Sequence, residues 1–193
     1  MPAEGRQHTH LDAALNYRQR GWRVIDLDVG SKSPGRPDWQ HERFEEGALR
    51  ERLSAGPRNV SILFGEPSGG LVDVDLDSAE ARMLADELLP PTASIFGRPG
   101  SPRSHRLYFV EPAPDYEMFS DPGGNDKNRA ALVEIRSGGQ HTIVPPSVHP
   151  SGEIIAWERD GQPAHLGSEE LRPAQQAGPC STRWAHKRRL GRR

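Results

Sequence analysis

The alternation of apolar and polar positions predicts most of the secondary structure of this chain. Helices are indicated where apolar residues recur every three or four positions, and strands where they alternate or form short runs. Helices are expected at residues 11–20, 44–53 and 78–89, and strands at residues 22–27, 60–64, 72–77, 92–96, 105–110, 132–136, 141–144 and 154–157. In the first half of the chain the predicted helices alternate with strands, and the second half contains mostly strands. This order predicts an α+β fold with a mixed or antiparallel sheet and flanking helices.

The strand at residues 72–77 has an acidic face. Side chains two positions apart share a face, so Asp73, Asp75 and Asp77 project together from this strand. Like charges side by side repel one another, and a solvated edge strand would accommodate them without any function. An apolar strand precedes this one and a helix follows it, which favours a central position instead. Converging carboxylates on a central strand point to a divalent cation, which prefers oxygen ligands.

Three further polar residues, Glu134, Arg136 and His105, lie on predicted strands. Glu134 interrupts an apolar strand, where a carboxylate is costly unless it is paired or binds a metal. Arg136 lies on the same face and could form a structural ion pair with it, and His105 could be a structural histidine. Two of the aspartates and Glu134, however, could together hold two metals about 3.5–4 Å apart, which suits nucleotidyl transfer. The sequence has no Walker A loop, so a triphosphate would need a different cradle.

Composition limits the class of protein. The chain has 193 residues, 34% of them hydrophobic, and 18 prolines, which fits one domain with long loops. It lacks an apolar run of the roughly 20 residues that a membrane span needs, and its polar start does not resemble a signal peptide. The single Cys180 excludes an internal disulfide and a cysteine-based metal cluster. We therefore expect a soluble, cytoplasmic protein with no membrane partner.

Charge and turn residues predict the domain boundaries. Residues 1–10 are expected to be disordered, residues 11–160 to form the domain, and residues 161–193 to be a poorly structured tail interrupted by proline and glycine. The net charge is −2, but residues 183–193 contain six basic residues and no acid, so the rest is clearly acidic. The basic tail could contact nucleic acid, or it could be a disordered end that improves solubility.

From residue 11 to about residue 157 the chain resembles the archaeo-eukaryotic primase superfamily. The particular likeness is to the N-terminal domain of the bifunctional primase–polymerases of plasmids, phages and bacteria. The loop 145–152, Pro-Pro-Ser-Val-His-Pro-Ser-Gly, is the most distinctive match, and the family's Asp-x-Asp motif falls on Asp75 and Asp77. The other matches are Ala14-Leu-Asn-Tyr17, Gly21-Trp22, Lys32-Ser-Pro34, Trp39, residues 59–65 and 68–72, Ser104-His-Arg-Leu-Tyr-Phe109 and Glu134-Ile-Arg136.

The resemblance implies a primase-like (RRM-like) catalytic core and a set of site residues. It implies that Asp75, Asp77 and Glu134 are catalytic and bind Mg²⁺ or Mn²⁺, and that His105 contacts the phosphates of the incoming nucleotide. The family usually approaches its histidine through small or glycine residues, whereas residues 101–104 here are Ser-Pro-Arg-Ser, whose arginine could bind phosphate. The predicted nucleotide-binding residues are therefore His105, Arg103, Ser104, Arg136, Ser147 and His149. The last two could instead belong to a rigid structural loop.

The function implied by this resemblance is that of a DNA primase/polymerase, a nucleotidyltransferase that makes or extends primers on a DNA template. The expected partners are a DNA template and primer, dNTPs or NTPs, and a separate replicative helicase. Two alternatives use the same residues. One is a non-catalytic module that binds DNA or nucleotides in replication. The other is a metal-dependent phosphoesterase, which would shorten a DNA strand rather than lengthen it.

Overall fold

The computed structural model describes residues 9–120 and 131–171. Within these residues the chain forms three α-helices, two short 3₁₀ helices and ten strands. In chain order they are α1 (His10–Gln19), β1 (Arg23–Asp28), η1 (Trp39–His41), α2 (Glu46–Ser54), β2 (Arg58–Leu63), η2 (Glu66–Ser68), β3 (Leu71–Asp75), α3 (Ala79–Leu88), β4 (Ser94–Arg98), β5 (Ser101–Glu111), β6 (Glu117–Ser120), β7 (Ala131–Arg136), β8 (His141–Ile143), β9 (Ala156–Asp160) and β10 (Ala164–Gly167).

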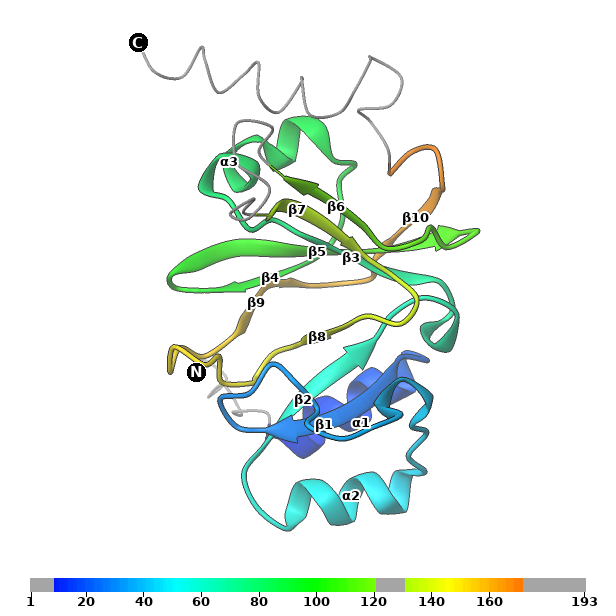
Figure 1. Ribbon diagram of the computed structural model, residues 1–193, viewed down its shortest axis with the longest axis vertical. Coiled ribbons are helices and arrows are strands. Elements are labelled where there is room, and N and C mark those ends of the chain that lie inside the picture. Colours follow the sequence, from blue (N-terminus) through cyan, green and yellow to red (C-terminus); the bar gives the residue numbers. More distant parts are fainter. Residues whose placement is uncertain (1–8, 121–130, 172–193) are drawn as a thin grey trace, which may run out of the picture.

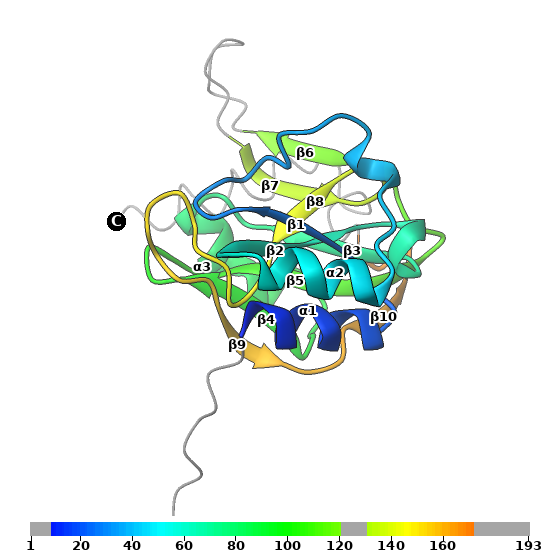
Figure 2. The same cartoon turned by 90° about the horizontal axis from the view of Figure 1, so that it is seen from below.

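The strands form two sheets. The smaller has the order β1-β2-β8 and is antiparallel. The larger has the order β6-β7-β3-β5-β4-β9 and is antiparallel, with β10 added in parallel to β5. Figure 1 shows the sheets one above the other, with α3 beyond the larger sheet and α1 and α2 beyond the smaller one. In the perpendicular view of Figure 2, α1 and α2 lie across the outer face of β1 and β2. The predicted α+β fold is therefore confirmed.

Local sequence explains where two of the helices begin. Thr9 caps α1, because its hydroxyl accepts a hydrogen bond from the Asp12 amide while the Asp12 side chain bonds back to Thr9. Ser78 caps α3 by accepting a hydrogen bond from the amide of Ala81.

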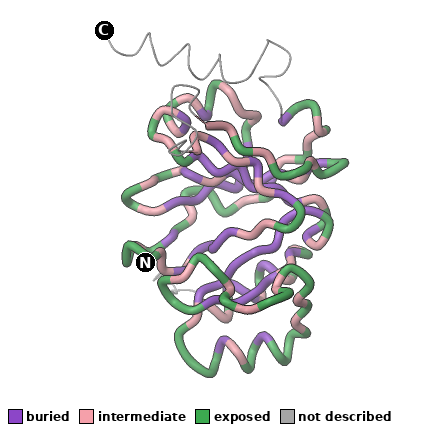
Figure 3. The backbone as a smooth tube through the Cα atoms, in the orientation of Figure 1, coloured by how far each residue is buried: buried purple, intermediate pink, exposed green. Residues whose placement is uncertain are grey.

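Buried residues, purple in Figure 3, include apolar side chains that form two clusters. One joins α1, α2 and the small sheet to the facing side of the large sheet, where Phe96 and Leu107 contribute. The other lies between the large sheet and α3. It includes Val72 and Val74 of β3 and Leu76, which directly follows this strand. Both faces of the large sheet are thus covered near β3, so a charged group on this strand is held inside the molecule.

The strand β3 is central, as its flanking elements predicted. It pairs with β5 on one side and with β7 on the other. Asp75 lies opposite His105 of β5 and opposite Glu134 of β7. The edge-strand interpretation of the aspartates is therefore wrong, and the two pairings bring the acidic and histidine positions to one place.

The ordered domain extends beyond the expected boundary at residue 160. The strand β10 pairs with the end of β5, and Leu171 is buried in the cluster beneath α3. The turn residues from 161 onward predict little structure. They do not reveal β10, because this strand is short and pairs with the distant strand β5. His10 already belongs to α1, whereas the remaining predictions for the two ends fall on residues 1–8 and 172–193, outside the described part. No helix in the described ranges is long and apolar enough to cross a membrane.

Candidate functional site

Three carboxylates converge at the end of β3. Asp75 is the last residue of the strand, Asp77 follows it, and Glu134 comes from the neighbouring strand β7. One oxygen of each lies within 4.8 Å of the others, close enough for all three to hold one cation. Asp75 is buried, Glu134 is half-buried and Asp77 is exposed. The cluster therefore has a solvent-facing side.

The electrostatics of this cluster favour a cation. Asp77 reaches solvent, but its carboxyl is partly shielded from water, and this shielding, and then the negative charges of Asp75 and Glu134, raise its pKa to about 6. A pKa raised by neighbouring acids means that the ionised cluster repels itself, and that a bound cation would relieve the repulsion. The oxygen donors and their charge fit Mg²⁺ or Mn²⁺.

Arg136 already offsets part of this charge. Its guanidinium contacts Oδ2 of Asp75 at 2.7 Å and Oε2 of Glu134 at 2.8 Å. The expected ion pair with Glu134 is thus present, and it also includes Asp75. In this arrangement one oxygen of each acid is occupied, so Arg136 and a cation would share the two carboxylates.

Asp73, the third acid of the strand face, has a different role from the other two. It is completely buried, and its Oδ2 lies 2.9 Å from Nδ1 of His105 and 2.7 Å from Oγ1 of Thr142. Because an ionised carboxylate can only accept, Nδ1 of His105 carries the proton in this contact. Phe96 also restrains the imidazole of His105, because the two rings stack with their centres 4.5 Å apart. Asp73 and Phe96 thus orient His105.

The position of His105 favours its charged form. Burial alone would lower the pKa of its imidazole, but the carboxylates of Asp75 and Asp73 outweigh burial, so the pKa is raised. A cationic histidine beside a carboxylate cluster is suited to contact phosphate oxygens.

A basic cleft adjoins the acids, between the two sheets. His105 and Arg136 contact Asp75 of the acidic cluster and also line the cleft. The complete lining is Lys32, Gly97, Arg98, Ser104, His105, Arg136, His141, Thr142, Ile143, His149 and Ile155. Burial, and then the charges of Arg136 and Arg36, lower the pKa of His141 to about 4, so this histidine is neutral near pH 7. The cleft is therefore positively charged where it meets the acids.

The structure brings most of the predicted site residues together. The three acids meet at the end of β3, and Ser104, His105, Arg136 and His149 line the adjoining cleft. Lys32, Arg98 and His141 also line it, and they were missed because they come from separate loops and strands with no shared periodicity. Asp73 was noticed only as an extra acid, because its pairing with His105 depends on the register of two distant strands.

Two predicted nucleotide-binding residues are not brought to the cleft. The Arg103 guanidinium instead contacts Asp86 at 2.9 Å and Glu158 at 3.3 Å. Arg103 has a φ of 56°, and the pairing of β4 with β5 shifts its register nearby, so side chains do not alternate regularly up to His105. Ser147 is buried and binds the backbone of Val60, accepting from its amide at 2.9 Å and donating to its carbonyl at 3.0 Å. These contacts are those expected of Ser147 in a rigid structural loop.

Comparison with models of protein families matches residues 14–175 to the N-terminal domain of the bifunctional DNA primase/polymerases. The match covers most of the chain and includes every residue of the acidic cluster and of the basic cleft. No curated protein sequence matches the chain significantly.

Proposed function

The chain belongs to the family of bifunctional DNA primase/polymerases, whose N-terminal domain it contains, and we propose that its site transfers nucleotides to the 3′-hydroxyl of a primer on a DNA template. The substrates are dNTPs or NTPs, and the product strand grows by one nucleotide as pyrophosphate leaves. The observation that carries this proposal is the junction of acids and cations: His105 lies 3.6 Å from Asp75 and lines the basic cleft.

We assign the metal-binding role to Asp75, Asp77 and Glu134, whose oxygens meet within 4.8 Å. Mg²⁺ or Mn²⁺ bound there would act as a Lewis acid on phosphate and hydroxyl oxygens. Arg136 keeps two of the carboxylates in place and balances their charge before a cation binds. Asp77 is exposed, so it is the ligand through which a cation would enter from solvent.

The basic cleft is assigned to the triphosphate. A nucleoside triphosphate is strongly anionic, and several cations aimed into one cleft would bind it without a Walker A loop. His105 would donate to phosphate through Nε2, because Asp73 occupies Nδ1. Lys32, Arg98 and His149 line the part of the cleft contributed by the loops and β4. Because Asp73 fixes the imidazole of His105, a phosphate bound to this imidazole would be held in a defined position relative to Asp75.

One observation favours the alternative of a non-catalytic DNA- or nucleotide-binding module. Arg136 occupies Oδ2 of Asp75 and Oε2 of Glu134, and a permanently bound guanidinium would compete with a metal ion. A nucleotidyltransferase would lengthen a primer, whereas a binding module would leave its length unchanged. A phosphoesterase, the third alternative, would shorten the primer.

Extension of an end-labelled primer on a DNA template tests the proposal. Reactions contain Mg²⁺ or Mn²⁺ with all four dNTPs or all four NTPs. We expect wild-type protein to lengthen the primer and the paired variant Asp75→Ala/Asp77→Ala to be at least about 100-fold slower, because charge stabilisation at the phosphoryl group is lost.

The matched control is Glu46→Ala, which removes an exposed acid that pairs with Arg50 on α2, away from the site. It is expected to extend the primer at the wild-type rate. Retained DNA or nucleotide binding without extension in either metal would support the binding module, and metal-dependent shortening of the primer would support the phosphoesterase.

A further inference from the structure

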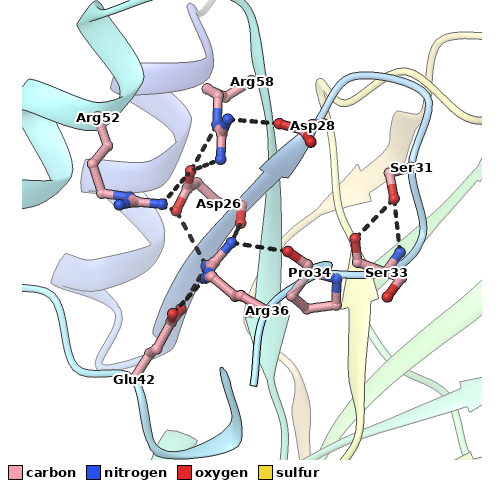
Figure 4. Close-up of polar contacts among 9 residues, drawn as sticks. All are labelled: Asp26, Asp28, Ser31, Ser33, Pro34, Arg36, Glu42, Arg52 and Arg58. Carbon is pink, nitrogen blue, oxygen red and sulfur yellow. Dashed lines mark hydrogen bonds and ion pairs between the residues drawn. The ribbon is translucent and has the colours of Figure 1, made fainter. Parts of the chain in front are cut away.

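Asp26 is a completely buried carboxylate held by three arginines, outside the acidic cluster and the cleft (Figure 4). Its Oδ1 accepts from Arg52 at 2.8 Å and from Arg36 at 3.3 Å, and its Oδ2 accepts from Arg58 at 2.7 Å. Burial alone would raise the pKa of Asp26, but the hydrogen bonds from Arg52 and Arg58 lower it, so the carboxylate is ionised. Asp26 therefore ties together α2, β2 and the segment that carries Arg36.

Two more acids balance the charge of this network. Arg36 also pairs with Glu42, and Arg58 also contacts Asp28 at 2.6 Å. Three cations and three anions thus form a closed, neutral group. A closed group of this kind has little net attraction for an anionic ligand, so a direct role in binding nucleotide is not indicated.

Arg36 differs from the other two arginines because it belongs to the loop at residues 29–38. Its guanidinium donates to the backbone carbonyl of Asp26 at 3.0 Å and to that of Pro34 at 3.3 Å, in addition to the carboxylates. Arg52 lies on α2 and Arg58 on β2. Figure 4 shows Arg36 between the loop and β1, with Pro34 on one side and Asp26 on the other. Arg36 therefore fastens the middle of this loop to the sheet.

The beginning of the loop is also ordered by short-range contacts. The amide of Ser31 donates to the carbonyl of Asp28. The hydroxyl of Ser31 donates to the carbonyl of Ser33 and accepts from the amide of the same residue. Figure 4 shows this turn next to Pro34. Lys32 is the central residue of this hydrogen-bonded turn, and the Arg36 anchor follows the turn in the chain.

Lys32 is the residue of this loop that reaches the cleft. It lines the cleft together with His105, and its charge acts on His149, whose pKa is lowered by burial and then by Lys32. Within residues 9–120 and 131–171, Lys32 forms no ion pair, so its ammonium is available for an anion. Ordering a lysine on a free loop costs conformational entropy, and a loop anchored beforehand reduces that cost.

We propose that Arg36 is a positioning residue, which holds the loop at residues 29–38 so that Lys32 binds the phosphates of the incoming nucleotide. The inference deepens the proposed function and rests on it. Arg36 itself does not touch the nucleotide. Its effect on binding passes through Lys32, and this dependence separates positioning from a general effect on stability.

The test measures binding of inorganic tripolyphosphate, and of dATP, to the full chain by calorimetry in the presence of Mg²⁺. Lys32→Ala is expected to weaken binding of both roughly tenfold, since a charge-assisted contact is lost. Arg36→Ala is expected to weaken binding roughly three- to tenfold. The double variant should bind no more weakly than Lys32→Ala alone, because a lysine that is absent cannot be misplaced.

Arg52→Ala is the matched control, because it removes another arginine from Asp26 without touching the loop. It should lower the melting temperature as Arg36→Ala does, yet change tripolyphosphate affinity by less than about twofold. If Arg36→Ala does not fold, Arg36→Lys takes its place, since a lysine can pair with Asp26 but cannot also span the two carbonyls.

Three results would overturn the inference. Arg36→Ala or Arg36→Lys could bind as tightly as wild type, Arg52→Ala could weaken binding equally, or the effects of Lys32→Ala and Arg36→Ala could multiply. Each of these leaves the proposed function intact as long as wild-type protein binds the triphosphates. If wild type binds neither tripolyphosphate nor dATP, the proposed function itself fails, and the inference fails with it.

Discussion

Single residues on the acidic face of β3 have different roles because their neighbours differ. Asp75 and Asp77 meet Glu134 at the open end of the strand, whereas Asp73 lies deeper and meets His105 and Thr142. Identical side chains at a spacing of two therefore give both the carboxylates that we propose as cation ligands and a carboxylate that orients His105. The distinction arises from depth in the sheet and from a diagonal contact: His105 lies opposite Asp75 in the strand register, but its imidazole bonds to Asp73.

At this scale we predict that Asp73 acts through its hydrogen bonds. Asp73→Asn retains an oxygen that can accept from His105 and Thr142. Asp75, whose charge raises the pKa of His105 more than the charge of Asp73 does, is still present. We therefore expect nucleotide affinity within about threefold of wild type. Asp73→Leu has a similar size but no acceptor and leaves a buried imidazole N–H unpaired, which costs about 1–3 kcal/mol, or roughly 5- to 150-fold in affinity. Titration of dATP in the presence of Mg²⁺ measures both.

Circular dichroism and thermal melting of the two Asp73 variants serve as the control for folding. Equal losses of affinity in Asp73→Asn and Asp73→Leu would mean that the negative charge matters rather than the hydrogen bond. Wild-type affinity in a folded Asp73→Leu would contradict any orienting role.

At the scale of elements, the hairpin of β4 and β5 decides which side chains reach the cleft. The backbone of residues 101–103 crosses Gly97 so closely that a Cβ there would lie 2.5 Å from the carbonyl oxygen of Ser101 and 2.6 Å from the amide nitrogen of Arg103. This crowding accompanies the register shift that directs Arg103 to Asp86 and Glu158. Arg98 and His105 still line the cleft from the two strands.

We therefore predict that Gly97→Ala destabilises the protein by about 1–3 kcal/mol, because the added methyl group meets backbone that must move. Urea unfolding monitored by tryptophan fluorescence measures the change. Gly47→Ala is the matched control, since Gly47 lies in α2 with no atom within 4 Å of the added carbon. It should be neutral or slightly stabilising, because alanine favours a helix. Equal stability of the two variants would show that the hairpin adapts without cost.

At the scale of the whole molecule, the end of the domain closes the second apolar cluster. The strand β10 continues the large sheet along residues Tyr108–Glu111 of β5, and Leu171 is 3% exposed beneath α3. Ala164 and Leu166 of β10 pack against the same cluster. A boundary at residue 160 would thus remove part of the sheet and uncover apolar side chains of the cluster.

We predict that a chain ending at Asp160 melts roughly 3–12 °C below a chain ending at Gln175, which keeps β10 and Leu171. Burial of a leucine side chain contributes about 1.5–3 kcal/mol, and in a domain of this size each kcal/mol shifts the melting temperature by about 2–4 °C. Differential scanning fluorimetry at equal protein concentration compares the two chains. Identical melting temperatures would contradict a stabilising role for β10.

Much of the site was determined by the sequence itself, because its signals are local. The spacing of two on β3 places its aspartates on one face wherever the strand lies, and the interrupted apolar strand marks Glu134. The family motifs add His105, and the match over residues 14–175 supports the family on which that prediction rested. Strand periodicity and motif order depend only on neighbouring residues, so they can be read from the chain alone.

The tertiary structure decided which of these side chains meet. The register of β3 with β5 separates Asp73 from the other aspartates, and the irregular β4–β5 pairing directs Arg103 away from the cleft. Lys32 lines the cleft from a loop that Arg36 anchors to β1. Strand register, bulges and anchored loops depend on contacts between residues far apart in the chain, and the local pattern of apolar and polar residues carries little information about them.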